Sequence, residues 1–517
     1  MTGPVLTGPA GLTLPALPLG ITLADPFAAA NPGQLNLRAS CTHGTLSVVV
    51  SGLTVTGNGT AALDCAPSWQ QAVAALAALA YTPPWPVVAD TIVVTVYDQA
   101  GDETAISLTF GAPVPPPAEV TAVAPVLPTV TARRAHDFSA MVAVNTHLDF
   151  GVSGATPQYG DLVAVAGLIN LIWGRSGVAP LLRDCPGANT DPALWGTFSQ
   201  LCTPLPARFI AYIGETAPGG YAPTIANALA MGDLVVALEG PDEPDTAAGN
   251  GLTGGLTAAA AMAAAATYMP ILFAQGLLHN LPVINFSFGQ GWTAANDWQG
   301  DYAAVGNLAA VCTYANAHTY PGALPPAATV AALNADARLA AAGRPVATTE
   351  FGYLSTIGLD VQARFLLAGL CDAFAAGAPI CAIYALLDDM SGAWGLADPS
   401  GVLRPAGTAL ATLLALLADP EATAATFAPG ALAYAAPGCA SILLQCADGS
   451  FRLLLWAEAP LTTGANPTVA VPLSLATPML ISVYDPMSGT DPLLTASGTT
   501  IALDVPVSPL VVTLHPV

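Results

Sequence analysis

Hydrophobic and polar positions change their periodicity along the chain, and each change marks a predicted domain. Residues 1–112 hold short runs that alternate or are β-branched, such as 44–50 and 90–97, separated by Gly, Asn and Pro. Alternation with a period of two between such turn residues is typical of antiparallel strands. One helical stretch, 68–79, interrupts the strands. We therefore predict a small β module over residues 1–112.

From residue 135 to 418 the pattern becomes a strand followed by a helix, repeated eight times. The predicted strands are 140–145, 179–182, 207–213, 234–238, 283–288, 312–316, 345–349 and 380–386. Eight such units in this length predict a (β/α)8 TIM barrel. A doubly wound sheet is the alternative, but no Gly-rich phosphate loop follows the first strand.

Two further segments complete the predicted architecture. Residues 113–134 begin with a Pro-rich run, which predicts a stiff linker. Residues 419–517 return to β runs, such as 441–445 and 451–456, and predict a C-terminal β-sandwich. The predicted fold is thus multidomain, with a (β/α)8 TIM barrel flanked by N-terminal and C-terminal β-sandwich domains.

Composition predicts large apolar cores and an acidic surface. Hydrophobic residues make up 53% of the chain, charged residues only 9%, and the formal net charge is −23. Nucleic acid is excluded as a partner, because binding phosphates needs many Lys and Arg residues. With few basic groups, protonating the carboxylates leaves only a small positive charge, so we expect the protein to tolerate acid.

Cysteine usage and apolar stretches bear on the cellular location. We expect up to four local disulfides, with Cys312 left over, from the pairs Cys41/Cys65, Cys185/Cys202, Cys371/Cys381 and Cys439/Cys446. Disulfides favour an extracellular or periplasmic protein, although no signal peptide is visible. No Cys/His spacing indicates zinc, and no metal is predicted in the barrel. The uncharged stretch 256–278 is Ala-rich and contains Pro270, which favours a barrel helix over a membrane span.

Carboxylates lie directly after two of the predicted strands. The fourth strand is followed by Gly-Pro and then by Asp242, Glu243 and Asp245, and the seventh strand leads into Glu350. TIM barrels hold their catalytic groups at the carboxyl ends of the strands, so Glu243 and Glu350 should face each other. A retaining glycoside hydrolase needs two such carboxyl groups, one to attack the anomeric carbon and one to protonate the leaving oxygen.

Three motifs at the strand ends resemble the clan A retaining glycoside hydrolases. They are Glu243-Pro after the fourth strand, His318-Thr-Tyr320 after the sixth, and Thr-Thr-Glu350-Phe-Gly at the seventh. The resemblance covers about residues 135–517 and is to β-xylosidase-like and endoglycosidase-like enzymes with a barrel and a β-sandwich. It implies that Glu243 is the acid/base and Glu350 the nucleophile.

The same resemblance implies supporting roles for five further residues. Tyr320 and Arg183 would contact the nucleophile, and His318 would lie beside the substrate. His147 would bind a sugar hydroxyl, and Tyr384 would form the aromatic platform under the sugar. Trp292, like Trp298 and Trp394, lies in a loop after a strand and suits stacking on a sugar ring.

One residue departs from the clan pattern. The clan usually has Asn before the acid/base glutamate, where it hydrogen-bonds the sugar 2-hydroxyl, whereas this chain has Asp242. An ionised Asp242 would raise the pKa of Glu243 by repulsion. We therefore expect an acidic activity optimum that is lost or shifted upward in Asp242→Asn. Asp242 also leaves an alternative open, a catalytically impaired carbohydrate-binding or surface scaffold protein.

The N-terminal module resembles bacterial cadherin-like or immunoglobulin-like modules in the order of its helical stretch, Leu-Ala-Tyr-Thr-Pro83 and strand 90–97. Such modules often bind calcium, for which Asp98 and Asp102 are the candidates here; no other cofactor is predicted. The expected partner is a β-linked polysaccharide or oligosaccharide. Its sugar, endo or exo cleavage, and hydrolysis or transglycosylation stay open.

Overall fold

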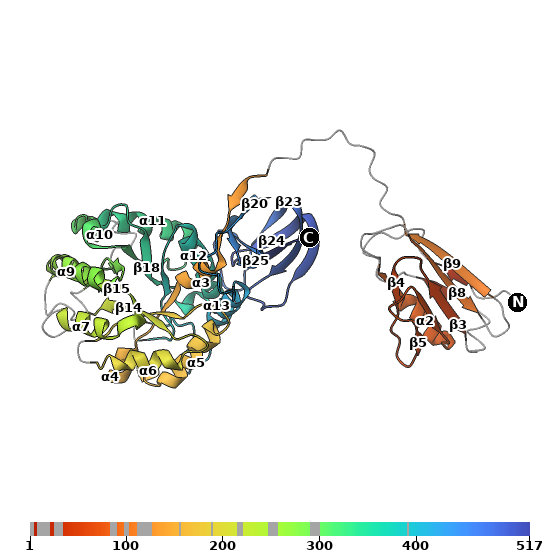
Figure 1. The fold of residues 1–517 in the computed structure, drawn as a ribbon, viewed down its shortest axis with the longest axis horizontal. Helices are drawn as coiled ribbons and strands as arrows, with labels where there is room; N and C mark the ends of the chain where they lie inside the picture. Colours follow the sequence, from red (N-terminus) through yellow and green to blue (C-terminus); the bar gives the residue numbers. More distant parts are fainter. Residues whose placement is uncertain are drawn as a thin grey trace. The chain divides into compact units, whose positions relative to one another are not determined.

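The protein is described by a computed structural model that covers residues 5–7, 21–24, 35–82, 90–97, 103–110, 127–154, 157–187, 190–214, 221–246, 257–289, 300–389 and 392–517. The chain forms two compact units, Met1–Pro125 and Val126–Val517. Figure 1 shows an N-terminal β unit and a larger unit in which helices surround a sheet.

The N-terminal unit is built on a five-stranded antiparallel sheet. Its order is β5 (Val55–Thr56), β6 (Ala62–Cys65), β3 (Asn36–Ser40), β8 (Asp90–Tyr97) and β9 (Glu103–Phe110). Two small sheets pair β1 (Val5–Thr7) with β2 (Thr22–Ala24) and β4 (Thr45–Ser47) with β7 (Ala80–Thr82). The expected helix is α2 (Trp69–Ala78), which begins at a capping box of Ser68 and Gln71. Asp98 and Asp102 lie outside the described residues, so calcium stays a prediction.

The second unit contains eight parallel strands that form a nearly closed barrel. Their order around the sheet is β16 (Val283–Ile284), β15 (Val235–Pro241), β14 (Arg208–Ile213), β13 (Leu181–Asp184), β12 (Val142–Asn145), β19 (Cys381–Ile383), β18 (Val346–Phe351) and β17 (Ala315–Thr319). A parallel bridge between Ile284 and Tyr314 links the two ends of this sheet. All eight predicted strands are therefore present, with ends that differ by a few residues.

Helices alternate with these strands and cover the outside of the sheet (Figure 1). They are α3 (Ala135–Met141), α4 (Leu148–Ser153), α5 (Leu162–Trp173), α6 (Ala193–Leu201), α7 (Ala222–Ala230), α9 (Ala258–His279), α10 (Gly300–Ala304), α11 (Pro326–Ala340), α12 (Leu359–Ala375) and α13 (Pro405–Leu416). Short 3-10 turns, η1 (Pro157–Tyr159), η2 (Gly232–Leu234), η3 (Pro244–Thr246), η5 (Ala309–Val311) and η6 (Ser355–Ile357), complete the connections.

Helix α9 is, within the described part of the chain, the one helix long and apolar enough to cross a membrane. Length and composition alone are weak evidence for a span, because core helices of soluble proteins share them. Its buried side chains include Met262, Ala265, Met269 and Leu272, which belong to the core around the barrel. The contacts agree with the expected barrel helix.

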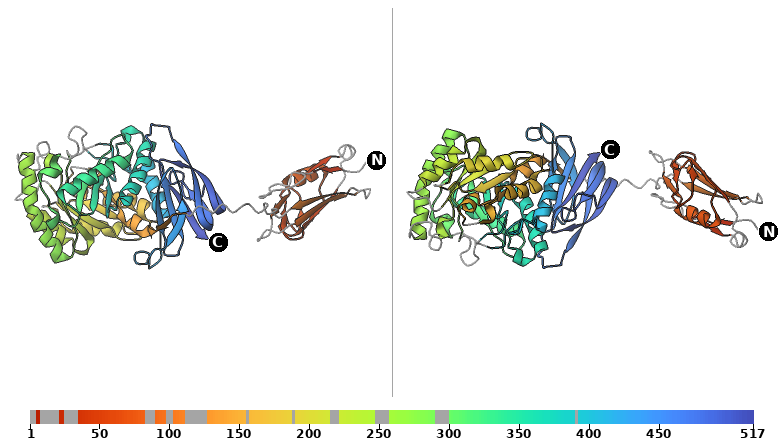
Figure 2. Two further views of the ribbon diagram at one scale, coloured as in Figure 1. Left: turned by 90° about the horizontal axis from the view of Figure 1, so that it is seen from above. Right: turned by 90° about the horizontal axis from the view of Figure 1, so that it is seen from below.

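The C-terminal strands form a second eight-stranded sheet against the barrel. Its strands are β10 (Thr129–Thr131), β20 (Ala431–Ala435), β23 (Thr468–Tyr484), β25 (Leu510–Pro516), β22 (Phe451–Trp456), β21 (Ala440–Gln445) and β11 (Arg133–Arg134), with β24 (Leu494–Pro506) beside β23. Both views in Figure 2 show this sheet at one side of the barrel, and Figure 1 labels α12 and α13 next to it. Leu454 and Trp456 belong to the barrel core, whereas Leu453 and Leu455 face a second core. The β character was predicted, but a two-sheet sandwich is not shown.

Residues 129–134 correct the expected linker. The stiff segment predicted from the sequence ended at residue 134, but β10 pairs with β20 and β11 pairs with β21. The alternation of Val130 and Ala132 with polar neighbours lets both apolar side chains pack on the core of the C-terminal sheet. These residues therefore belong to the second unit.

The expected disulfides are also wrong, since all nine cysteines, which lie in the described residues, are free. Cys65 faces Leu37 across the sheet, whereas Cys41 hydrogen-bonds Ala61, so the two cysteines stand about four residues, or ~13 Å, apart along the strands. Cys439 and Cys446 flank the whole of β21. A disulfide needs Cα atoms within about 4.4–6.8 Å of each other. The extracellular or periplasmic location loses this support and stays a prediction.

Candidate active site

Residues inside the barrel lie in layers, because side chains two positions apart on a strand point the same way. The lower layer is apolar and contains Ala143, Ile210, Ala237, Ile284, Ala347 and Ala382. The next layer lies two positions further along each strand, toward the carboxyl ends. Its side chains are polar and buried: Asn145, Arg183, Glu239, Asn316 and Thr349. An apolar floor therefore supports a polar layer at the end of the barrel where (β/α)8 folds carry chemistry.

Arg183, on β13, is the centre of the polar layer and is only 1% exposed. Its Nε and Nη2 donate to the two carboxylate oxygens of Glu239 at 2.7 and 2.9 Å. Its Nη2 also donates to Asp242 at 2.6 Å, and its Nη1 donates to Glu350 at 2.6 Å. The guanidinium lies 4.2 Å from the ring centre of Tyr212. A single buried cation thus holds three carboxylates in fixed positions.

Glu239 is the residue that the sequence analysis missed. It is completely buried on β15, and its Oε1 accepts hydrogen bonds from Arg183, Asn316 and Thr349. The predicted strand ended at Leu238, one residue before Glu239, and no role was predicted for Glu239. The sequence does contain a signal for Glu239, because it lies two positions after Ala237 and so faces the same side of the strand. A carboxylate buried at that position requires a cation as its partner.

The two predicted catalytic glutamates meet at His318. Glu243 follows β15, Glu350 lies on β18, and His318 lies on β17. The His318 Nδ1 is 2.6 Å from Glu243 Oε1 and 3.4 Å from Glu350 Oε2. One oxygen of each glutamate and a nitrogen of His318 all lie within 4.8 Å of one another. The side chains of Glu243 and Glu350 keep 21% and 8% of their surface exposed, so both can be reached from solvent.

Two further predicted contacts to Glu350 are present. The Tyr320 hydroxyl donates to Glu350 Oε2, and Arg183 donates to Glu350 Oε1. Both donors favour the ionised form of this carboxylate. His318, in contrast, is fully buried and contacts the two glutamates, whereas the resemblance implied a position beside the substrate.

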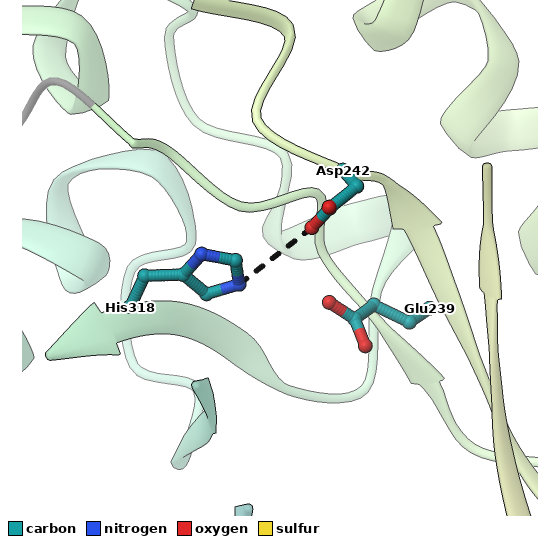
Figure 3. Close-up of side chains that lie close together, drawn as sticks. All are labelled: Glu239, Asp242 and His318. Atoms are coloured by element: carbon teal, nitrogen blue, oxygen red, sulfur yellow. Dashed lines mark ion pairs between the residues drawn. The ribbon is translucent and has the colours of Figure 1, made fainter. Parts of the chain in front are cut away.

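Asp242 lies between the polar layer and Glu243. Figure 3 shows its carboxylate directed toward His318, with Glu239 below both, and the Asp242 Oδ1 is 3.8 Å from His318 Nε2. The same Oδ1 accepts from Arg183 at 2.6 Å and from the Ser287 hydroxyl at 3.1 Å. Ser287 also accepts the backbone N–H of Glu243, whose φ is +40°. This left-handed backbone is strained in a non-glycine residue and turns the Glu243 side chain toward His318.

The hydrogen bonds around Thr349 determine where His318 carries its proton. The Thr349 hydroxyl donates toward Asn316 Oδ1 at 2.7 Å and Glu239 Oε1 at 2.9 Å, both of which are acceptors only. Thr349 can therefore only accept from His318 Nε2, which lies 3.2 Å away and must carry a hydrogen. In a neutral His318 the Nδ1 is then an acceptor, and Glu243 must donate to it. One proton is consequently held between Glu243 and His318.

Burial and charge shift the pKa of each carboxyl group in the site. Burial raises the pKa of Glu243 to about 8, with help from the charge of Asp242. Burial raises the pKa of Glu350 to about 7, against the opposing charges of His318 and Arg183. Burial alone would raise the pKa of Asp242, but Arg183 and His318 outweigh it and the pKa is lowered. Glu350 and Asp242 therefore ionise before Glu243 does.

The remaining predicted residues lie beside this centre. His147 Nε2 is 3.1 Å from Asp389, and the Tyr384 hydroxyl donates to the same carboxylate at 2.5 Å. Tyr384 precedes a cis peptide bond and lies with its ring 6.1 Å from Tyr320. The Trp394 ring lies 4.9 Å from Tyr320. Trp292 and Trp298 lie outside the described residues, so stacking by them stays a prediction.

Two groups in the site have the spacing of metal ligands: Glu239, Asp242 and His318, and Glu243, His318 and Glu350. Arg183 already donates to both carboxylates of the first group. His318 Nδ1 shares a proton with Glu243 in the second. A metal ion would have to displace the guanidinium or this proton, so the donor set fits a pair of catalytic carboxyl groups better than a metal centre.

Comparisons with known proteins give only distant likenesses. No family model matches the chain, and no curated protein matches it. A 4-O-α-L-rhamnosyl-β-D-glucuronidase from Fusarium oxysporum 12S matches 75% of this chain and 99% of its own, with 14% identity and a TM-score of 0.46. A glucosidase from Croceicoccus marinus matches 67% and 91%, with 13% identity and a TM-score of 0.43.

A third structure, the bifunctional glucanase-xylanase CelM2 from a metagenome library, matches 75% of this chain and 97% of its own, with 10% identity and a TM-score of 0.41. All three TM-scores lie below 0.5. We therefore rest the function on the geometry of the carboxylates around Arg183 and His318.

Proposed function

We propose that this protein is a retaining glycoside hydrolase that cleaves β-linked glycans, with Glu350 as nucleophile and Glu243 as acid/base. The observation that supports this most is the oxygen–oxygen approach of Glu243 and Glu350 within 4.8 Å at the carboxyl ends of parallel strands. Retaining enzymes separate their carboxyl groups by roughly 5–5.5 Å, whereas inverting enzymes need roughly 6.5–9.5 Å to fit a water molecule.

In the first step, ionised Glu350 attacks the anomeric carbon and the bond to the leaving oxygen breaks. Glu243 donates its proton to that oxygen, so the aglycone leaves as an alcohol. Tyr320 and Arg183 hold the Glu350 carboxylate, which keeps it ionised and fixes its direction of attack. The products are a glycosyl ester on Glu350 and an ionised Glu243.

In the second step, Glu243 takes a proton from water, and the water oxygen attacks the anomeric carbon. The ester bond to Glu350 breaks, the carboxylate is restored, and the sugar leaves with its original configuration. His318 contacts both glutamates and lies where it can compensate the charge that moves between them. A sugar hydroxyl in place of water would give transglycosylation from the same residues.

The pKa values change the expected pH dependence. Activity requires ionised Glu350 and protonated Glu243, so the rate should peak between their pKa values of about 7 and about 8. This differs from the acidic optimum expected from the sequence, because burial raises both pKa values. The charge of Asp242 helps to raise the pKa values of both Glu243 and Glu350. Asp242→Asn should therefore move both limbs of the pH–rate profile to lower pH. This is opposite to the upward shift that we expected from the sequence.

Azide rescue of two variants tests the assignment of the carboxylates. We expect Glu350→Ala to lose activity on aryl β-glycosides by roughly 10⁴-fold or more and to form an α-glycosyl azide when azide is added. Glu243→Ala should keep cleaving dinitrophenyl glycosides, which need no proton, and should form a β-glycosyl azide. Glu421→Gln, at an exposed position away from the barrel mouth, is the matched control.

NMR of the first sugar released gives an independent readout of the mechanism. Retention of the β configuration is expected, and inversion would contradict a glycosyl-enzyme intermediate. If neither the wild type nor any variant cleaved or transferred a glycoside, the carbohydrate-binding alternative would replace the hydrolase.

A further inference from the structure

Asp242 presents a free carboxylate oxygen next to the reacting pair. Its Oδ1 accepts from Arg183 and Ser287, whereas its Oδ2 accepts no hydrogen bond from any residue in the described part of the chain. The side chain remains 15% exposed. In a retaining site, the anomeric carbon, C1, lies between the nucleophile and the acid/base. The carbon bonded to C1 is C2, and its substituent, a hydroxyl or an amine for example, differs between sugars. An oxygen beside both glutamates is therefore placed to bind the C2 substituent.

The charges around this oxygen favour a cation as that substituent. Arg183 is shared with Glu239 and Glu350, so it does not neutralise Asp242 alone. Arg183 and His318 outweigh the effect of burial and keep the pKa of Asp242 low, so this carboxylate is ionised when Glu243 is still protonated. Because Asp242 is partly exposed, its ionised Oδ2 can accept a hydrogen bond from a ligand that enters the site.

The segments that follow the barrel strands in the sequence contain almost no positive charge. The segments after the strands hold eleven Asp and Glu residues but only two basic residues, His147 and Arg404: 146–161, 185–192, 214–221, 242–257, 285–299, 320–325, 352–358 and 384–404. Both basic residues already contact carboxylates, His147 with Asp389 and Arg404 with Asp388. These segments therefore hold no basic residue other than two that already contact carboxylates, which disfavours an anionic sugar.

We propose that the substrate is a β-linked glycan of 2-amino-2-deoxy sugars with free amines, whose C2 ammonium group binds Asp242. This proposal rests on the proposed hydrolase function and names its substrate class. An ammonium group donates up to three hydrogen bonds, and one of them fills the vacant acceptor position of Asp242 Oδ2.

The chemistry of the transition state gives a reason for Asp at this position. Positive charge develops at the anomeric carbon, and an ammonium group on the adjacent carbon opposes it. A fixed carboxylate beside that ammonium offsets the repulsion, and it does so more strongly in a partly buried site than in water. A neutral amide at position 242 would bind a hydroxyl or an acetamide without offsetting this charge.

A panel of nitrophenyl β-glycosides tests the proposal with the full chain. The panel contains the free-amine, neutral, N-acetylated and uronic acid forms of the same sugar, in both gluco and galacto configurations, at a pH where the amine is protonated. We expect kcat/KM to be highest for the amine and lowest for the uronide. Added salt should reduce kcat/KM for the amine more than for the neutral sugar, because screening weakens the attraction.

Asp242→Asn provides the second arm of the test. The ratio of kcat/KM for the amine over the neutral sugar should fall roughly 10- to 100-fold, whereas Glu421→Gln should leave that ratio unchanged. A neutral or anionic sugar cleaved as well as the amine by the wild type, or an unchanged ratio in Asp242→Asn, would overturn the proposal and leave the hydrolase intact. If the wild type cleaves nothing in the panel and azide rescues neither glutamate variant, the proposed function itself is refuted, and this proposal with it.

Discussion

Glu243, the proposed acid/base, is connected by hydrogen bonds to buried residues of the polar layer. Glu239 and Asn316 accept from Thr349, Thr349 accepts from His318 Nε2, and His318 Nδ1 accepts the hydrogen bond of protonated Glu243. Each hydrogen bond in this series determines whether the next group must donate or accept. In the proposed mechanism, the polar layer of the barrel therefore helps to set the protonation of Glu243, and Thr349 is a positioning residue.

Replacing Thr349 by Val tests this chain of hydrogen bonds. The variant keeps the shape of the side chain but removes the acceptor for His318 Nε2, so the imidazole can hold its proton on Nδ1 and compete with Glu243. We expect kcat to fall roughly 10-fold and the alkaline limb of the pH profile to move to lower pH. Thr349→Ser, which retains the hydroxyl, should restore both. A lower kcat with an unchanged pH profile would mean that Thr349 only fills space.

At the residue scale, the sequence pointed to residues that follow the predicted strands, but not to Glu239, which is buried on β15. Glu243, Glu350, Tyr320 and Arg183 meet because the carboxyl ends of parallel strands share one end of the barrel. Glu239 was missed because its role depends on which face of β15 points inward, and the predicted strand stopped one residue short. The short predicted sixth strand likewise left His318 in a loop, whereas β17 buries it between the glutamates.

At the scale of elements, two carboxyl groups lie where α12 meets the C-terminal sheet. The Trp456 indole, at the end of β22, donates to Asp372 Oδ1 at 3.2 Å and to Glu458 Oε1 at 2.7 Å. Burial and, to a smaller extent, the adjacent Glu458 together raise the pKa of Asp372 to about 8. Two carboxylates so close are stable when they share one proton. Sequence periodicity predicted both elements but could not place these two side chains together.

This pair should make the second unit less stable as the pH rises. Folded Asp372 keeps its proton until about pH 8, whereas in the unfolded chain it loses the proton near pH 4, so the free energy of unfolding falls between these values. Asp372→Asn cannot ionise and can donate to Glu458. We expect the variant to melt roughly 1–3 °C higher than wild type at pH 8 and at about the same temperature at pH 5. An equal shift at both pH values, or the same gain in the exposed control Asp504→Asn, would contradict this account.

At the scale of the whole molecule, pH acts on acidic groups and histidines, because all eleven Lys and Arg residues are arginine and keep their charge. The two units should respond in opposite directions. In the second unit burial raises the pKa of Asp184 to about 7 and that of Asp149 to about 6, as it does for Asp372 and both glutamates. In the first unit Asp90 accepts four backbone N–H groups and the Tyr81 hydroxyl. These bonds outweigh burial and lower its pKa.

Calorimetry of the full chain at several pH values should therefore resolve two transitions that move apart. Raised pKa values stabilise the second unit in mild acid, so its melting temperature should be several degrees higher at pH 5 than at pH 8. The lowered pKa of Asp90 stabilises the first unit above about pH 4, and that stability is lost as the pH falls further. Asp90→Asn should abolish the acid shift of the first transition, lower it at pH 7, and leave the second in place. Two transitions that shift together would show that net charge, and not these buried groups, governs acid tolerance.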